Sequence, residues 1–207
     1  MSLENELLDT QRTRWLDIGS GGQFHPQFHY IDIFPIDLVP AAHQDRYHRL
    51  DIVNALPEQL DALGTFDLVR LQHTFEHWNF EDGLRALINC ARLLDPGALL
   101  LVSVPDLAVH ARRYLDDSYP SSPEYRDWAW QRIPRDAPAS AYFSVFAHSM
   151  TYEPHKWCYD YEGLAYQIER SGFFANVKRL ELGDRLSGVP FTHNRPQEDV
   201  CVLAERV

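Results

Sequence analysis

The sequence is short of cysteine and has no long apolar run, and each shortage excludes a class of protein. Its 207 residues include three cysteines, Cys90, Cys158 and Cys201, which are odd in number and form neither a CxxC pair nor a zinc-type spacing. We therefore expect buried reduced thiols and no disulfide framework. The longest apolar run, Ala98 to Val102 with Val104, is far shorter than the roughly 20 residues that span a bilayer. No signal sequence opens the chain, so we expect a cytoplasmic protein with no membrane partner.

Basic residues are also scarce. Lysine and arginine number 19 against 30 aspartates and glutamates, and the formal net charge is −11. Proteins that bind nucleic acid concentrate Lys and Arg on a surface, so we expect no nucleic-acid partner. The length and the 45% hydrophobic content are typical of one globular domain, which we place at residues 1–207. The oligomeric state remains open.

The distribution of apolar residues predicts an α/β fold. Apolar stretches that read as strands alternate with helix-length connections, and the predicted strands are 15–18, 28–34, 47–52, 66–72 and 98–104. Helical spacing is found at 56–63, 81–94 and 159–171, and two closing strands are expected at 176–182 and 200–205. This alternation indicates a doubly wound, mostly parallel sheet with helices on both faces.

Residues 106–156 interrupt this pattern. The segment is rich in proline and aromatic residues, namely Tyr114, Tyr119, Trp128, Trp130, Tyr142, Phe143 and Phe146. It is too hydrophobic for a linker, so we expect a mainly helical or irregular lid insertion over the substrate crevice. Its aromatic rings suit stacking against a sugar, although rings fill cores more often.

Glycines and polar side chains follow the predicted strands at the points where these strands end. The turn Gly19–Gly22 follows the first strand, and the later strands end near Asp32, Asp51, Gln72 and His73. In open parallel sheets, ligands bind beyond the carboxyl ends of the strands. The sequence therefore predicts a backbone cradle and two carboxylates around one crevice.

Several of these segments, taken together, resemble the class I S-adenosylmethionine-dependent methyltransferases from about Arg14 to Pro105. The segments are Leu16–Gly21, Tyr30–Ile33, Leu50–Ile52, Phe66–Val69 with Glu76-His77, and Leu93–Gly97, followed later by His155–Trp157 and Gly172-Phe173. The resemblance implies a Rossmann-like, seven-stranded sheet whose last strand is antiparallel. A narrower likeness, in Gln23–Pro26 and His73–His77, is to methyltransferases encoded with bacterial surface-polysaccharide genes.

The resemblance implies S-adenosyl-L-methionine as the cofactor and a role for each motif residue. Asp32 would accept hydrogen bonds from both ribose hydroxyls, which suits a carboxylate with two acceptor oxygens. Asp51 would accept from the adenine amino group, and Ile33 and Ile52 would flank the ring.

The remaining cofactor contacts follow from the glycine turn and the fourth strand. Gly19, Ser20 and Gly21 would bind the amino-acid part of the cofactor, with Asp17 holding the turn through hydrogen bonds. Gln72 would line the methionine end.

A general base assists methyl transfer to an oxygen or nitrogen acceptor. His73, just past the fourth strand, is the first candidate because an imidazole titrates near neutral pH; His148 and His155 are alternatives. Glu76 and His77 are interpreted as residues that hold the strand-to-helix turn. With His73 they have i, i+3, i+4 spacing, but no second cluster of ligands is evident, so we expect no metal.

The sequence thus predicts a methyltransferase acting on a small-molecule or sugar hydroxyl. The alternative is a cofactor-binding but catalytically degenerate protein that acts through a partner, because Gln23 stands where the family often has a third glycine. A nicotinamide dehydrogenase is disfavoured, since that fingerprint needs a glycine at the position of Phe24.

Overall fold

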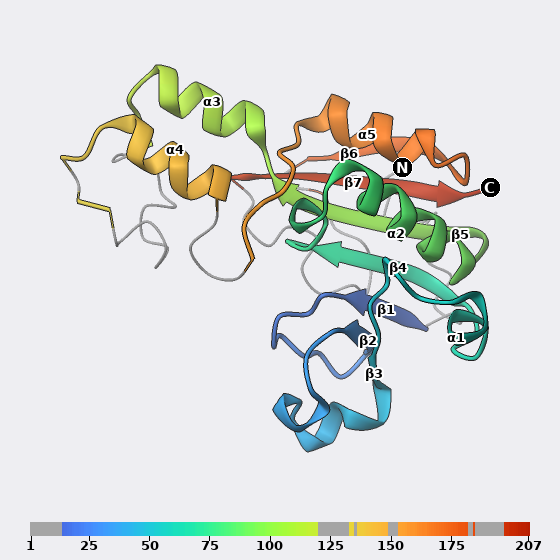
Figure 1. The fold of residues 1–207 in the computed structure, drawn as a ribbon. Coiled ribbons are helices and arrows are strands. Elements are labelled where there is room, and N and C mark those ends of the chain that lie inside the picture. Colours follow the sequence, from blue (N-terminus) through green and yellow to red (C-terminus); the bar gives the residue numbers. More distant parts are fainter. Residues whose placement is uncertain (1–13, 120–132, 135, 149–152, 182–183, 185–196) are drawn as a thin grey trace.

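A seven-stranded sheet forms the centre of the computed structural model, which describes residues 14–119, 133–134, 136–148, 153–181, 184 and 197–207 (Figure 1). The strands are β1 (Trp15–Ile18), β2 (Phe28–Asp32), β3 (Tyr47–Arg49), β4 (Phe66–Gln72), β5 (Leu94–Pro105), β6 (Phe174–Leu180) and β7 (Asp199–Arg206). Their order is β3-β2-β1-β4-β5-β7-β6, and β7 runs antiparallel to both of its neighbours. The predicted mostly parallel sheet with an antiparallel last strand is confirmed.

The strand order reverses between β1 and β4. From β1 the chain moves outward through β2 to β3, returns, and then moves the other way through β4 and β5. The connections after β1 and β4 therefore leave the sheet in opposite directions, which opens a crevice at the carboxyl ends of these two strands. The sequence motifs around Gly19 and His73 both lie at this point.

Helices α1 (Pro57–Asp61), α2 (Phe80–Arg92) and α5 (Tyr161–Arg170) cover one face of the sheet (Figure 1). Asn79 caps α2 by accepting from the Asp82 amide at 2.9 Å, and Asp160 caps α5 in the same way from Gly163. Their apolar faces join the larger core cluster. The opposite face carries a second cluster built on Trp15, Phe28, Tyr30 and Leu68, among others.

The third strand is shorter than predicted. It ends at Arg49, not at Ile52, because Asp51 accepts a hydrogen bond from the Val53 amide at 3.0 Å and turns the chain. Ile52 consequently belongs to the turn and packs into the larger core cluster.

Two helices of the segment 106–156, α3 (Leu107–Leu115) and α4 (Ala139–His148), pack against each other beyond the carboxyl ends of β4 and β5 (Figure 1). Tyr119, Tyr142 and Phe146 are buried in a small core of their own. These rings thus fill the core of the helical pair, the commoner role of aromatics.

Some predictions concern parts of the chain outside the described residues. They are the N-terminal segment before Arg14, Trp128 and Trp130 of the segment 106–156, and most of the loop before Asp199. Within the described ranges, no helix is both long and apolar enough to cross a bilayer.

Candidate functional site

The glycine turn after β1 ends in a tight reversal at Gly21 and Gly22. Gly21 and Gly22 have φ of 55° and 88°, and the Gln23 amide donates to the Ser20 carbonyl at 2.9 Å. Two central residues with positive φ and an i to i+3 hydrogen bond are typical of a type I′ turn, which favours glycine at both positions. Gln23 occupies the fourth position, where φ is not positive, so the turn closes without a third glycine.

Gly19 is required by its contact with the loop after β4. It has φ of 75°, and a Cβ at this position would lie 2.3 Å from Thr74 Oγ1. The Thr74 hydroxyl is within 3.1 Å of the carbonyl oxygens of both Ile18 and Gly19, to which it donates. The two loops at the strand reversal are therefore joined directly.

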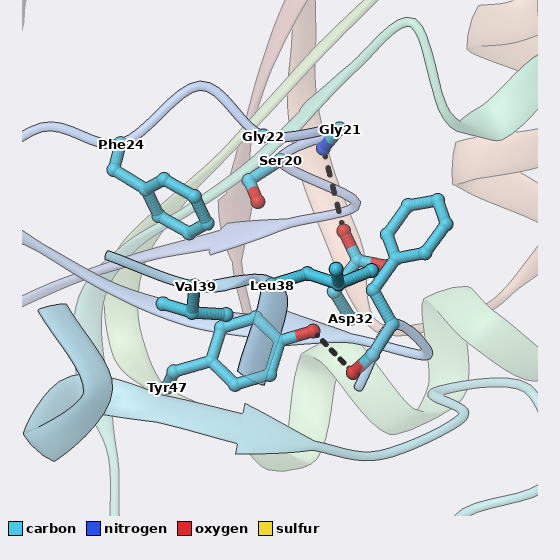
Figure 2. A pocket seen from close by; sticks show the side chains of 9 residues that line it. Ser20, Gly21, Gly22, Phe24, Asp32, Leu38, Val39 and Tyr47 are labelled. Atoms are coloured by element: carbon cyan, nitrogen blue, oxygen red, sulfur yellow. Dashed lines mark hydrogen bonds between the residues drawn. The ribbon is translucent and has the colours of Figure 1, made fainter. Parts of the chain in front are cut away.

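A pocket opens beside this turn. Its lining comes from the turn, the end of β2 and the connection to β3: Ser20, Gly21, Gly22, Phe24, Asp32, Phe34, Leu38, Val39 and Tyr47. In Figure 2 the Ser20 hydroxyl points into this space, and it is buried without a hydrogen-bond partner in the described part of the chain. A Cβ on Gly21 would meet no atom within 4 Å, so the main chain there is open to a ligand.

Asp32 forms the floor of the pocket next to the turn. Its Oδ2 accepts from the Gly21 amide at 3.3 Å and its Oδ1 from its neighbour Ile33 at 2.7 Å, as drawn in part in Figure 2. A carboxylate offers about four lone-pair sites, so two amide bonds leave acceptor capacity for a ligand. The structure thus brings together Ser20, Gly21 and Asp32 of the predicted cofactor site.

The apolar wall of the pocket was missed at the sequence level. Phe24, Leu38 and Val39 come from loops and a 3-10 turn whose pattern is irregular, and Tyr47 begins β3; no motif points to any of them. The Tyr47 hydroxyl donates to the Phe34 carbonyl at 2.8 Å. Burial and the nearby Asp32 carboxylate raise the pKa of Tyr47 to about 12, so this donor stays protonated.

The other predicted adenine and methionine contacts lie outside this pocket. Asp51 is exposed, and its oxygens bind the Val53 amide and the Asn54 side chain, which is the local turn-forming role. Ile52 is 3% exposed in the core, so its predicted place beside the adenine ring is not supported, whereas Ile33 is 56% exposed and free to contact a ring. Gln72 ends β4 at the crevice, where its role remains a prediction.

Asp17 does not hold the glycine turn as predicted. It is buried in the sheet, and its two oxygens accept from Arg70 Nε at 3.2 Å and Nη2 at 2.7 Å, across the β1–β4 pairing. Burial raises the pKa of Asp17 against the opposing effect of the guanidinium. Arg70 also lies 4.2 Å from the Phe28 ring centroid. Arg70 lies directly opposite Asp17 in the β1–β4 pairing. Predicting this ion pair therefore requires knowing the register of the two strands.

The geometry of His73 does not suit a general base. Its Nε2 lies 3.0 Å from Asp199 Oδ2 and its Nδ1 lies 3.4 Å from Glu76 Oε1, so both ring nitrogens face carboxylates. Burial alone lowers the pKa of His73, but the two carboxylates outweigh it and raise the pKa to about 10. The prediction that this imidazole titrates near neutral pH is therefore wrong. His73 has φ of 52° and joins the ends of β4 and β7.

Glu76, His77 and His155 meet at the same edge of the sheet. One possible ligand atom from each lies within 4.8 Å of the other two. The Glu76 carbonyl accepts from the amides of Lys156 and Trp157, which brings the chain after α4 back to the end of β4. The second cluster that the sequence lacked is thus supplied by His155, 78 positions after His77. His148, the other alternative base, is exposed at the end of α4.

Comparison with known families gives one decisive match. Residues 3–173 match the family described as "Methyltransferase domain", which is most of the chain. The chain belongs to this methyltransferase family. The match and the strand order together confirm the resemblance to class I methyltransferases and set the dehydrogenase reading aside.

Solved structures agree on the fold of this methyltransferase. It superimposes on the S-adenosylmethionine-dependent methyltransferase SibL with a TM-score of 0.56 at 17% identity, over 95% of this chain and 51% of that one. An O-methyltransferase family protein from Burkholderia thailandensis superimposes with a TM-score of 0.55 at 14% identity, over 95% of this chain and 52% of that one. The third structure is the N-methyltransferase NodS from Bradyrhizobium japonicum WM9 in complex with S-adenosyl-L-homocysteine. Its TM-score is 0.50 at 11% identity, over 94% of this chain and 78% of that one.

The methyltransferase spans about half the length of the first two structures. No curated protein gives a significant match.

The residues present fit the cofactor of class I methyltransferases. The Ser20 hydroxyl is a buried polar atom without a partner in the described residues, and it faces the same space as the open Gly21 main chain. Buried polar atoms without partners are rare in native proteins, and a ligand is one way to satisfy them. Asp32 retains acceptor capacity for a diol beside them.

Proposed function

We propose that this methyltransferase transfers a methyl group from S-adenosyl-L-methionine to a hydroxyl of a small molecule or sugar. The observation that carries the cofactor part is the meeting of the open Gly21 main chain, the unpartnered Ser20 hydroxyl and Asp32 at the strand reversal. Asp32 would accept from the ribose hydroxyls, and such bonds to a charged acceptor are worth roughly 1.5–3 kcal/mol each.

The acceptor would sit beyond β4, beneath the helices α3 and α4. This edge holds Glu76, a buried carboxylate, with His77 and His155 beside it. A hydroxyl has to lose its proton as it takes the methyl group, and a buried cluster of carboxylate and imidazole groups supports that loss. The segment 106–156 is proposed as a substrate lid because its helices α3 and α4 lie beyond this edge (Figure 1).

The protein's own contribution is mainly alignment. Methyl transfer needs the acceptor oxygen in line with the breaking carbon–sulfur bond, and fixing that geometry can supply about 7–11 kcal/mol. Thr74 links the cofactor turn to the loop that leads into Glu76 through hydrogen bonds to the Ile18 and Gly19 carbonyls, which supports a fixed placement of donor and acceptor.

The test has two stages with purified protein. Calorimetric titration with S-adenosyl-L-homocysteine is expected to show binding, and its absence would overturn the cofactor assignment. A panel of nucleotide sugars, simple sugars, phenols and amines is then incubated with radiolabelled donor. Transfer to a hydroxyl supports the proposal, and transfer only to amines contradicts it. Binding without transfer to any of them would favour the alternative, a degenerate protein acting through a partner.

A further inference from the structure

The cluster of Glu76, His77 and His155 has the composition of a metal site. One carboxylate and two imidazoles are the ligand set of catalytic zinc centres, which keep a fourth position open. Their ligand atoms lie within 4.8 Å of one another. In a tetrahedral centre with metal–ligand distances of about 2.1 Å, neighbouring ligand atoms lie about 3.4 Å apart. Small side-chain rotations would bring the three ligand atoms to that separation.

Glu76 gives the second, independent sign of a ligand. Its side chain is almost fully buried, and neither carboxylate oxygen has hydrogen-bond geometry to any described residue. Oε1 is 3.4 Å from His73 Nδ1, close enough for an ionic contact, while Oε2 has no such neighbour among them. A buried carboxylate oxygen without a partner is costly, and a bound cation would remove that cost.

The imidazoles are oriented as metal-binding histidines usually are. His77 Nδ1 lies 3.4 Å from the Pro154 carbonyl, so a proton on Nδ1 leaves the lone pair of Nε2 available. The ring of His155 has a hydrogen bond to the backbone of Phe146. Histidine ligands typically donate their second nitrogen to a carbonyl or carboxylate, which sets the tautomer and the ring direction.

We propose that Glu76, His77 and His155 bind a first-row transition-metal ion of the Zn²⁺ type, with an open position for an oxygen ligand. The hard cations Mg²⁺ and Ca²⁺ prefer all-oxygen sites, whereas imidazole suits Zn²⁺ and its neighbours. A hydroxyl bound at the open position becomes more acidic, as metal-bound water does. That last role rests on the proposed methyl transfer, but metal binding does not.

The experiment uses untagged full-length protein, stripped with a chelator and titrated with Zn²⁺ and Co²⁺ without cofactor or acceptor. We expect one ion per chain, bound at micromolar or tighter concentration, and a Co²⁺ absorption spectrum of low coordination number. His155→Ala and Glu76→Gln are each expected to weaken binding by at least about tenfold. Circular dichroism and thermal melts establish that each variant is folded. If Glu76→Gln does not fold, His77→Ala is measured in its place.

The matched control is His48→Asn, in β3. Its ring stacks on that of His29 with centroids 6.2 Å apart, so the change removes a histidine pair that lies away from the cluster. Full binding by His48→Asn supports the proposal. No binding by the wild type, or equal binding by His155→Ala and the wild type, overturns it.

A second measurement tests the open position. Acetohydroxamate, a small oxygen chelator, is added to the Co²⁺-loaded protein. A change in the visible spectrum is expected, because the chelator enters the fourth position. An unchanged spectrum would mean a closed site and would overturn that part of the proposal.

Discussion

The Thr74 hydroxyl is within 3.1 Å of the Gly19 carbonyl oxygen, and it fills the space that a side chain on Gly19 would need. The contact joins the loop after β1 to the loop after β4 at the point where the strand order reverses. Together with the bond from Thr74 to the Ile18 carbonyl, it links the cofactor turn to the loop that leads to Glu76.

Gly19→Ala is expected to destabilise the protein more than an ordinary left-handed glycine replacement. The positive φ alone costs roughly 1–2 kcal/mol, and displacing Thr74 adds about 1–3 kcal/mol. Urea unfolding measures the loss. The control is Gly97→Ala, where φ is 82° and the new Cβ meets nothing within 4 Å. Equal losses of unfolding free energy in the two variants would show that displacing the Thr74 side chain costs nothing.

Asp32→Ala is expected to weaken S-adenosyl-L-homocysteine binding by at least about tenfold, since each lost bond to the carboxylate is worth roughly 1.5–3 kcal/mol. Calorimetry measures the affinity, and a cooperative melt verifies the fold. Asp37→Ala removes an exposed carboxylate nearby that does not line the pocket, and it should bind like the wild type. If Asp32→Ala binds equally well, the ribose assignment fails.

Asp17→Leu is expected to cost about 3–5 kcal/mol of unfolding free energy, because it removes the counter-charge of Arg70 inside the sheet. The double variant Asp17→Leu/Arg70→Met should recover most of that loss. The exposed pair Asp61–Arg92, with the same two-bond geometry, is the comparison, and Asp61→Leu should change stability far less. No recovery in the double variant would mean that the pair is not the source of the loss.

His73→Gln is expected to lower stability and to leave most of the turnover intact. The charged hydrogen bond lost to Asp199 is worth about 1.5–3 kcal/mol, and the ionic contact with Glu76 is lost as well. If His73 were a general base, its loss would instead lower kcat by roughly 10²–10⁴-fold, the contribution typical of such groups. The measurement is kcat per folded protein with an acceptor found in the panel. A loss of that size at unchanged stability would restore His73 as the base.

Local sequence patterns were sufficient for the fold class and for one half of the cofactor site. Neighbours within a few positions determine the apolar run of β4, the caps of α2 and α5, the turn at Gly21 and Gly22 and the bond from Ile33 to Asp32. Interactions of this range are readable from spacing and residue type alone.

Only the tertiary structure decided the partners of the charged residues. Asp17 meets Arg70 through strand register, and His73 meets Asp199 across 126 positions because β7 returns beside β5. His155 reaches Glu76 and His77 because the chain after α4 donates two amides to the Glu76 carbonyl. The energy of a charge depends on what lies within a few ångströms of it, and for these residues those neighbours come from distant segments. The sequence by itself therefore determined the methyltransferase framework, and packing determined which residues are available for its chemistry.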